Sequence, residues 1–289
     1  MNPKICIVGS ANIDQISYVD TIPSDGETVF GDSYQMGFGG KGANQAVMAG
    51  LLGADVYMIA CLGTDVYNKM TVDNLNNNNV NTDYIQTVNG SSGVAPIWVD
   101  KTGQNRIIVI PGANNLIDAD IAIDSLSSIG PLDVVVGQFE IPLEVNEKVF
   151  EYARNNGVQT VLNPAPAGDV SEKLLNSTSW FIPNEVEFEE MLGEPFNENA
   201  LLKHSKDAKP EIIVTLGEKG CAEVSDGKVY IHQAKKVTAI DTTGAGDAFV
   251  GSFSYGLASK MSKQDSIQLA LEKATNSVTK KGTQSSYKD

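Results

Sequence analysis

Short runs of β-branched and other apolar residues alternate with longer stretches of helical character, and this alternation restricts the chain to few folds. Runs that are apolar on both faces are typical of strands in a parallel sheet covered on two sides. The sequence therefore predicts an α/β fold with a mainly parallel central sheet. The predicted strands are 5–8, 56–61, 134–136, 160–162, 180–182 and 212–215, and the predicted helices are 41–52, 66–76, 143–156, 184–192 and 245–258.

Two regions, 15–38 and 91–110, interrupt this alternation. Each alternates polar with apolar residues and contains a turn signal, Pro23–Gly26 in the first and Asp100–Gly103 in the second. We predict two antiparallel hairpins that are inserted into one α/β domain spanning residues 1–289. The hairpins are expected to pair into a small sheet that covers a site.

The net charge of the 289-residue chain is −15. So acidic a surface repels nucleic acid and anionic lipid, which argues against both as the main partner. An anionic small ligand would need cations and backbone N–H groups gathered locally. The sequence predicts a reducing, cytoplasmic environment. Its three cysteines are scattered without a CxxC pair, and it contains neither a run of 18 apolar residues nor a leader in which basic residues precede apolar ones.

The segment Asp241–Phe249 carries the strongest chemical signal. Small residues at 244–246 open a predicted helix, so their free N–H groups and the helix dipole form a site for an anion. Asp247 in this first turn either stabilises the helix start or accepts a proton from a hydroxyl that attacks a phosphoryl group. We favour the second interpretation, because an acid and an anion site at one turn are what phosphoryl transfer needs.

The segment Gly37–Gln45 is rich in glycine and contains a G-x-G-x-x-G pattern. A dinucleotide-binding fold would place this pattern directly after the first strand, whereas here a hairpin intervenes, so we reject that interpretation. The glycines are expected to let the backbone approach a polar ligand closely, with Lys41 and Asn44 pointing at it. No G-x-x-x-x-G-K-[ST] pattern is present, which excludes a Walker-type ATPase.

Polar residues follow several of the predicted strands. Asn12 and Asp14, after the first strand, either pair with vicinal hydroxyls or simply form a turn. Because ligands of open α/β sheets bind outside the carboxyl ends of the strands, such positions predict a site along one sheet edge. The later strand ends carry Glu140, Asn163, Asn184 and the glycine turn 215–220. Asn184 either caps a helix or faces a nucleotide and its Mg²⁺.

Taken together, these residues closely resemble the ribokinase branch of the phosphofructokinase B family of carbohydrate kinases. Gly244–Asp247 marks the whole family, whereas Gly39–Gln45 together with Glu140 and Gly282–Ser286 is typical of the ribose-using branch. The resemblance implies a three-layer α/β/α fold with a small antiparallel β lid, and phosphorylation of the 5-hydroxyl of D-ribose by ATP. It covers nearly the whole chain in order: 9–14, 39–45, 112–114, 140, 163–166, 184–187, 215–220, 241–247 and 282–287.

The resemblance also implies a role for each matching residue. The residues that would hold the sugar are Asn12, Asp14, Gly40, Lys41, Asn44 and Glu140. Asp247 would be the general base, and the N–H groups of Gly244, Ala245 and Gly246 would form the anion hole. The ATP side would be lined by Asn184, Thr215, Gly217, Gly220, Gly246 and Asn276, with Mg²⁺ influenced through water by Asn184 and Glu187. A monovalent cation, usually K⁺, would lie at Asp241, Thr243, Gly282 and Ser286 and at the backbone carbonyls of Ser277 and Lys280. The lid would also serve as the interface of a homodimer.

Two departures from the family pattern concern the nucleotide and cation sites. The stretch 270–281 looks about one helical turn shorter than in the family, so the residue that touches the adenine edge is Asn276, is Thr275 or is missing. The sequence given also ends at Lys288-Asp289, where relatives continue, so looser adenine and cation sites are expected.

Three other functions are alternatives to a ribose kinase. The first is a kinase for another sugar or a nucleoside, the second is a non-catalytic sugar sensor on the same scaffold, and the third is the dehydrogenase already rejected. An intact Asp247 after Gly-Ala-Gly argues against a sensor, which needs no base. With only two histidines, His204 and His232, both outside the motifs, a zinc site or a histidine-based triad has little support.

Overall fold

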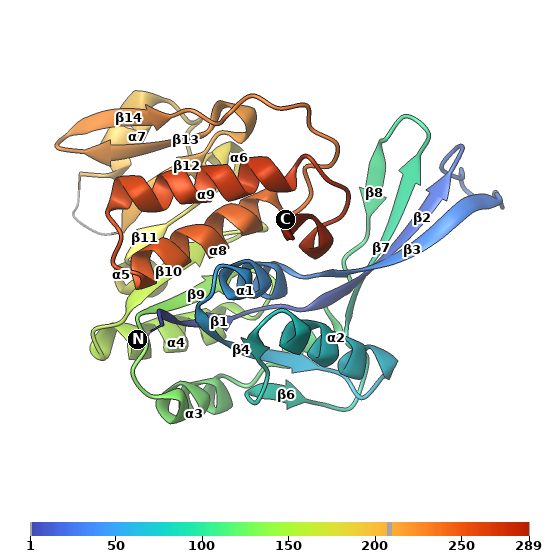
Figure 1. Cartoon of the computed structure of the whole chain (residues 1–289), viewed down its shortest axis with the longest axis horizontal. Helices are drawn as coiled ribbons and strands as arrows, with labels where there is room; N and C mark the ends of the chain where they lie inside the picture. Colours follow the sequence, from blue (N-terminus) through green and yellow to red (C-terminus); the bar gives the residue numbers. More distant parts are fainter. Residues whose placement is uncertain (1, 207–209, 289) are drawn as a thin grey trace.

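The computed structural model describes residues 2–206 and 210–288, so Met1 and Asp289 of the predicted domain lie outside the described residues. Over these residues the central sheet has ten strands in the order β14-β13-β12-β11-β10-β9-β1-β4-β5, with β6 beside β4 (Figure 1). Along this spatial order, the strands β12, β11, β10, β9, β1, β4 and β5 pair in parallel, whereas β13 and β14 add an antiparallel edge. The bounds are β1 Lys4–Val8, β4 Asp55–Leu62, β5 Val80–Asn81, β6 Ile85–Thr87, β9 Val134–Gln138, β10 Gln159–Asn163, β11 Trp180–Phe181, β12 Glu211–Thr215, β13 Cys221–Ser225 and β14 Lys228–His232.

Helices cover both faces of this sheet, because alternate residues of its buried strands are apolar on both sides (Figure 1). In β1, Ile5 and Ile7 belong to the hydrophobic core of one face, while Cys6 and Val8 belong to the core of the other. The first core contains residues of α1 Lys41–Leu51, α2 Val66–Asn77, α8 Ala245–Ala258 and α9 Lys263–Ser277; the second contains residues of α3 Ala119–Ile129, α4 Leu143–Asn155, α5 Glu172–Ser177, α6 Glu185–Leu192 and α7 Glu198–His204. The predicted layers and mainly parallel sheet are confirmed.

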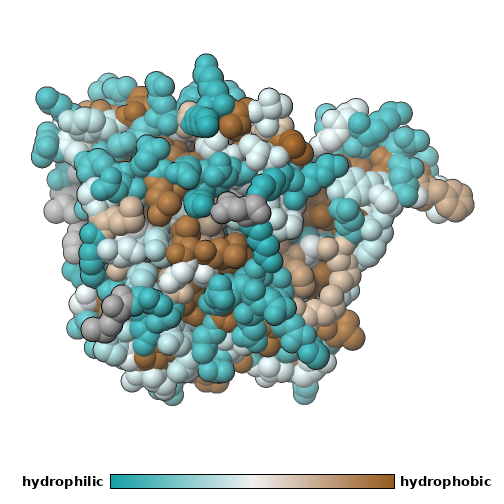
Figure 2. Space-filling model, viewed as in Figure 1, coloured by the Kyte–Doolittle hydropathy of each residue, from teal (hydrophilic) through white to brown (hydrophobic). Residues whose placement is uncertain are grey.

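A second, small sheet contains the strands β2 Asn12–Val19, β3 Gly31–Gly39, β7 Gly93–Asp100 and β8 Asn105–Ile107, in the order β3-β2-β7-β8. The two predicted hairpins pair antiparallel within themselves, β2 with β3 and β7 with β8, and a parallel β2–β7 pair joins them. This small sheet projects from the main body (Figures 1 and 2). The exposed apolar residues of its strands and of the segments next to them are Phe30, Tyr34, Met36, Ile107, Ile108, Val109 and Ile110.

Most helices begin at a residue whose side chain accepts hydrogen bonds from the first turn. Asp65 accepts from Tyr67 at the start of α2, and Asp118 accepts from the N–H groups that open α3. The helices α1 and α8 differ, because Gly40 and Gly244 precede them and offer no side-chain cap. At the start of α1 the N–H groups of Lys41 and Ala43 donate to Glu140 and to the Ser10 carbonyl, so of these two helix starts it is α8 that leaves N–H groups available to a ligand.

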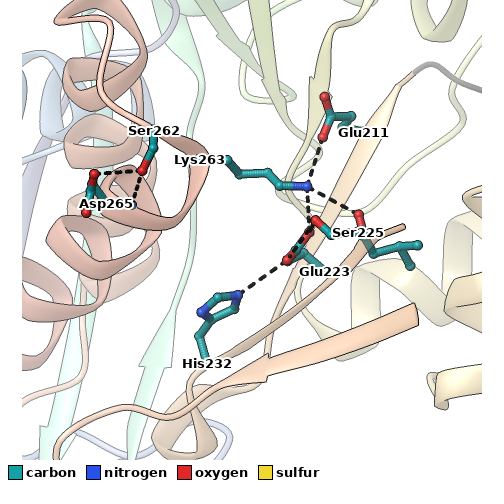
Figure 3. A network of polar contacts seen from close by, with 8 residues as sticks. Glu211, Glu223, Ser225, His232, Ser262, Lys263 and Asp265 are labelled. Carbon is teal, nitrogen blue, oxygen red and sulfur yellow. Dashed lines mark hydrogen bonds and ion pairs between the residues drawn. The ribbon is translucent and has the colours of Figure 1, made fainter. Parts of the chain in front are cut away.

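An ion-pair network fastens the start of α9 to the antiparallel edge of the sheet (Figure 3). The Lys263 ammonium lies 2.7 Å from a carboxylate oxygen of Glu223, which is 2% exposed, and 3.3 Å from Glu211. Burial alone would lower the pKa of Lys263, but the hydrogen bonds and charges of Glu223 and Glu211 together raise that pKa. The network fixes α9, and α9 packs against α8.

No helix in the described ranges is long and apolar enough to cross a membrane.

Candidate active site

The parallel strands of the central sheet end at one edge, where the polar residues singled out from the sequence follow them. β1 leads through Gly9–Ala11 into Asn12, β9 is followed by Glu140, and β10 ends at Asn163. Next along the sheet, β11 leads to Asn184, which forms a parallel bridge with Thr215 at the end of β12. The structure thus brings the predicted sugar side and nucleotide side to one edge.

Gly244 begins α8 in a conformation that only glycine adopts without strain. Its φ is +76°, and a Cβ there would lie 2.4 Å from Thr283 Cγ2 and 2.6 Å from the Tyr287 hydroxyl. Tyr287 donates a hydrogen bond of 2.7 Å to the Gly244 carbonyl. The C-terminal segment 282–287 therefore holds the backbone from which the N–H groups of Ala245 and Gly246 project at the helix start.

Asp247 is 7% exposed in the first turn of α8, and both of its carboxylate oxygens accept amide hydrogen bonds. Asn44 Nδ2 lies 2.8 Å from Oδ2, and Gln45 Nε2 lies 3.0 Å from Oδ1. Burial raises the pKa of Asp247, although the charge of Lys41 and the two amide donors oppose that rise. A buried carboxylate with a raised pKa and unused lone pairs is suited to accept a proton.

Lys41 opens α1 among carboxylates. Burial alone would lower the pKa of Lys41, but the charges of Asp247, Glu140 and Glu187 raise it. Glu140 Oε2 accepts hydrogen bonds from the Ser10 hydroxyl at 2.5 Å and from the Lys41 backbone N–H at 3.1 Å. The Glu140 carboxylate therefore stabilises the start of α1 and still presents its second oxygen.

Gly40 lets the backbone before α1 pass against the chain that follows β1. Its φ is +86°, and a Cβ at this position would lie 2.7 Å from both Ala11 Cα and the Asn12 nitrogen. No larger residue fits between the two segments, so the glycine brings the N-terminus of α1 next to β2.

Asn12 and Asp14 lie at the start of β2, at the base of the small sheet. Asn12 is buried, and its Oδ1 accepts a 2.7 Å hydrogen bond from Asn114 Nδ2. Burial, followed by the charges of Glu140 and Asp247, raises the pKa of Asp14 to about 6. Asp14 thus belongs to the same polar group as Asp247 and Glu140, and Asn12 lies two residues before it on β2.

The predicted nucleotide residues Asn184, Thr215, Gly217 and Gly220 lie at or after the ends of β11 and β12, and Asn276 lies on the last turn of α9. Asn184 and Glu187 form a capping box at the start of α6, with 2.8 Å hydrogen bonds in both directions, so the capping interpretation of Asn184 is correct. Gly220 has a φ of +104°, and a Cβ there would lie 1.9 Å from the His232 carbonyl, so this turn requires glycine. Gly217 opens the exposed turn before it, and Asn276 is exposed on the last turn of α9.

The predicted cation residues come from two loops that are tied together. Asp241 accepts hydrogen bonds of 3.0 Å from the N–H groups of Thr243 and Gly282, and although burial alone would raise its pKa, these donors lower it. The Ile240 N–H donates to the Val278 carbonyl at 2.7 Å. The hydroxyls of Ser277 and Ser286 donate to backbone carbonyls, and Lys280 Nζ donates to the Lys288 carbonyl. Carbonyl, hydroxyl and carboxylate oxygens are the donors that a hard cation prefers, so this set fits one.

Among the described residues, no group of three or more His, Cys, Asp and Glu side chains forms a metal cluster. Several residues of the site were not singled out from the sequence for it. They are Ser10, which binds Glu140; Asn114, which binds Asn12; Gln45, which binds Asp247; and Gln138, Gln284 and Tyr287, which hold neighbouring groups. All six are buried, and the sequence signal that could have found two of them, Gln45 and Gln138, is a polar side chain among apolar neighbours.

Comparison with known proteins gives a consistent result. The chain matches the description pfkB family carbohydrate kinase over residues 2–289. It is 38% identical to a ribokinase of Haemophilus influenzae, covering 99% of this chain and 95% of that protein, and 35% identical to a deoxyribokinase of Salmonella typhimurium, covering 98% and 95%. The structure of Arabidopsis thaliana ribokinase complexed with ribose and ATP superimposes with a TM-score of 0.88 at 30% identity, covering 99% of this chain and 96% of that one.

Proposed function

The chain belongs to the pfkB family of carbohydrate kinases, and from that we propose that it phosphorylates D-ribose at its primary 5-hydroxyl with ATP, giving ribose 5-phosphate and ADP. The observation that carries the proposal is a carboxylate and an uncapped helix N-terminus in one turn. Asp247 and the N–H groups at 244–246 open α8 together, beside polar groups suited to a polyol. A sugar sensor would have no use for that carboxylate.

In the reaction we propose, Asp247 takes the proton of the 5-hydroxyl, and the freed oxygen attacks the γ-phosphorus of ATP. The bond between the γ-phosphorus and the β–γ bridging oxygen breaks, and ADP leaves with the electron pair. The N–H groups of Gly244, Ala245 and Gly246 face the charge that develops on the transferred group. Lys41 adds positive charge at the site of a chain whose net charge is negative.

Sugar binding is assigned to the polar residues at the base of the small sheet. Asp14 and the free oxygen of Glu140 accept from hydroxyls, and Asn12 and Asn44 contribute amide groups. Deoxyribose is the second candidate substrate, supported by the 35% identity to a deoxyribokinase. The small sheet is proposed to cover the sugar as a lid and, through its exposed apolar residues, to form a homodimer.

ATP is proposed to lie along Asn184, Thr215, Gly217, Gly220 and the last turn of α9, with Mg²⁺ on its phosphates near Glu187. The oxygen set of Asp241, Thr243, Ser277, Lys280, Gly282 and Ser286 would hold a monovalent cation such as K⁺. When bound, that cation would supply a fixed positive charge beside the loop before α8. A cytoplasmic location is proposed, since ATP is available there and the free thiols of Cys6, Cys61 and Cys221 persist there.

The test is a coupled ADP-release assay with ATP and Mg²⁺, run on ribose, 2-deoxyribose, other pentoses and nucleosides, with K⁺ or with choline as the only monovalent cation. We expect turnover that depends on ribose and rises with K⁺. Turnover on 2-deoxyribose in preference to ribose would keep the mechanism and replace the substrate. Bound ribose without turnover on any substrate would refute the proposal in favour of a sensor.

A further inference from the structure

A chain of side-chain amides ends on Asp247, and neither the proposed base nor the anion hole accounts for it. It begins at α2, where Asn78 Nδ2 donates to Asn74 Oδ1 at 3.2 Å. Asn74 Nδ2 then donates to Gln284 Oε1 at 2.7 Å, and Gln284 Nε2 donates to Asn44 Oδ1 at 2.9 Å. Asn44 Nδ2 completes it with the 2.8 Å bond to Asp247 Oδ2. We call these four amides the amide chain.

Every bond of the amide chain runs in the same direction, from NH₂ to oxygen and toward Asp247. An ionised carboxylate only accepts, so it fixes the orientation of Asn44, which in turn fixes Gln284 and Asn74. Asn44 and Gln284 are 5% exposed and Asn78 is 2% exposed. Asn74 is half-buried, so water can reach it, whereas the bonds that Gln284 and Asn44 make toward Asp247 are closed to water. Turning one of these amides over would set oxygen against oxygen along the amide chain.

A shorter chain reaches the other oxygen of Asp247. Gln138 Nε2 donates to Gln45 Oε1 at 2.7 Å, and Gln45 Nε2 donates to Asp247 Oδ1 at 3.0 Å. Both glutamines are fully buried. Each carboxylate oxygen thus receives an amide whose orientation is set by another amide, and such aligned hydrogen bonds polarise one another.

We propose that Asn74 and Gln284 are positioning residues, which orient Asn44 and thereby hold Asp247 in the geometry and charge state that its reaction needs. The proposal rests on the proposed role of Asp247 as base. Gln284 also lies on the segment that carries Tyr287, which binds the Gly244 carbonyl. One C-terminal segment therefore supports both the base and the backbone beside the anion hole.

Other charged or titratable groups also act on Asp247, and substitution of Asn74 leaves each of them in place. They are Lys41 of α1, Glu140 after β9, Asp14 of β2, Glu187 of α6 and Tyr287 of the C-terminal segment. A change at Asn74 thus tests the amide chain with the rest of the site intact.

The informative variant is Asn74→Asp. A carboxylate at 74 cannot donate, so Gln284 must turn its NH₂ toward it and its oxygen toward Asn44. Asn44 then turns in the same way and presents its oxygen to Asp247. Asn74→Ala removes the first donor without forcing this inversion. We expect kcat at pH 7 to fall about tenfold for Asn74→Asp and less than about threefold for Asn74→Ala, with the acid limb of the kcat profile of Asn74→Asp displaced upward by about one pH unit.

The matched control is Asn77→Asp, the same substitution on the last turn of the same helix, at an exposed residue for which the described part of the chain gives no side-chain hydrogen bond. An added negative charge there opposes the helix dipole at least as strongly as one at 74. We expect the kcat profile of Asn77→Asp to match that of the unchanged protein. The same upward displacement in both variants would show a general charge effect and would overturn the proposal.

A stability cycle tests the amide chain without any assay of turnover. Thermal unfolding is measured for the unchanged protein, Asn74→Asp, Asp247→Asn and the double variant. An asparagine side chain at position 247 can donate as well as accept, so it tolerates the reversed orientation of the amides in the amide chain. We expect Asn74→Asp to lower Tm by roughly 3–8 °C when Asp247 is present, and by less than half as much in the Asp247→Asn background. Equal losses in both backgrounds would refute the amide chain.

The two experiments separate this proposal from the proposed function. Non-additive stabilities in a protein without sugar-dependent turnover would support the amide chain and refute the kinase. Turnover on ribose with additive stabilities would support the kinase and refute the amide chain.

Discussion

Asp14 offers a quantitative test of the site, because its folded environment favours the protonated carboxyl. Burial and the charges of Glu140 and Asp247 raise its pKa to about 6 from 3.8. The folded chain therefore keeps this proton over a pH range in which the unfolded chain has released it. Stability falls as the pH rises through that range, and the loss is complete above about pH 6. Asp14→Asn removes this titration and should be the more stable protein at neutral pH.

The size of the effect follows from the two pKa values. Their difference corresponds to roughly 3 kcal/mol at neutral pH. Because Asp14 is only partly buried and water screens its charge, we expect about half of this, or a Tm gain of roughly 3–5 °C for Asp14→Asn at pH 7.5.

The assay is thermal unfolding of both proteins from pH 3.5 to 8 in the absence of sugar. The difference in Tm between Asp14→Asn and the unchanged protein should grow between about pH 4 and about pH 6 and then stay constant. Asp32→Asn, at an exposed carboxylate of the small sheet, is the matched control and should show no such rise. A difference that is the same at every pH would refute the electrostatic description of the site.

Three further outcomes are expected. Asp247→Asn should lower kcat by about 10²–10⁴-fold while calorimetry still detects sugar binding; unchanged turnover would remove Asp247 as the base. Gly244→Ala places a Cβ within 2.4 Å of Thr283 Cγ2 at a φ of +76°, so both Tm and turnover should fall. Tyr287→Phe loses one hydrogen bond and should lower the unfolding free energy by only about 1 kcal/mol. Burial raises the pKa of Cys221 to about 12, so a thiol reagent at pH 8 should label this cysteine only after unfolding.

The central sheet could be predicted because its strands carry their own signal. A run such as Ile5–Val8 is buried on both faces, so its apolar residues are continuous, and the bounds of β1 differ from the prediction by one residue. The helices α3, α5, α7 and α9 were not predicted, and α3 and α9 are the long ones among them. Each has a capping side chain at its start, Asp118 and Ser262, but α3 is interrupted by serines and α9 buries only part of one face.

The pairing of the two hairpins depends on contacts distant in sequence. Each hairpin has a local turn signal, and both antiparallel pairs agree with the prediction. The parallel β2–β7 pair, with Asn12 opposite Gly93, joins segments far apart in the sequence and has no local signal. Asn12, Glu140 and Asn184 each follow a strand of the central sheet, and since parallel strands end at a common edge, their places in the sequence put them at that edge.

The buried amides around Asp247 show which further residues of a site can be recognised from the sequence. Gln45 lies next to Ala43, Ala46 and Val47 in a helix whose buried residues are mostly small or apolar, and Gln138 ends a fully buried strand. A fully buried amide needs partners for its donors and its acceptor, and the backbone of a regular helix or strand provides none. Such a side chain is therefore evidence that polar groups from other elements converge on it. At the edge where several strands end, that convergence indicates a site, even though the sequence does not say which groups meet there.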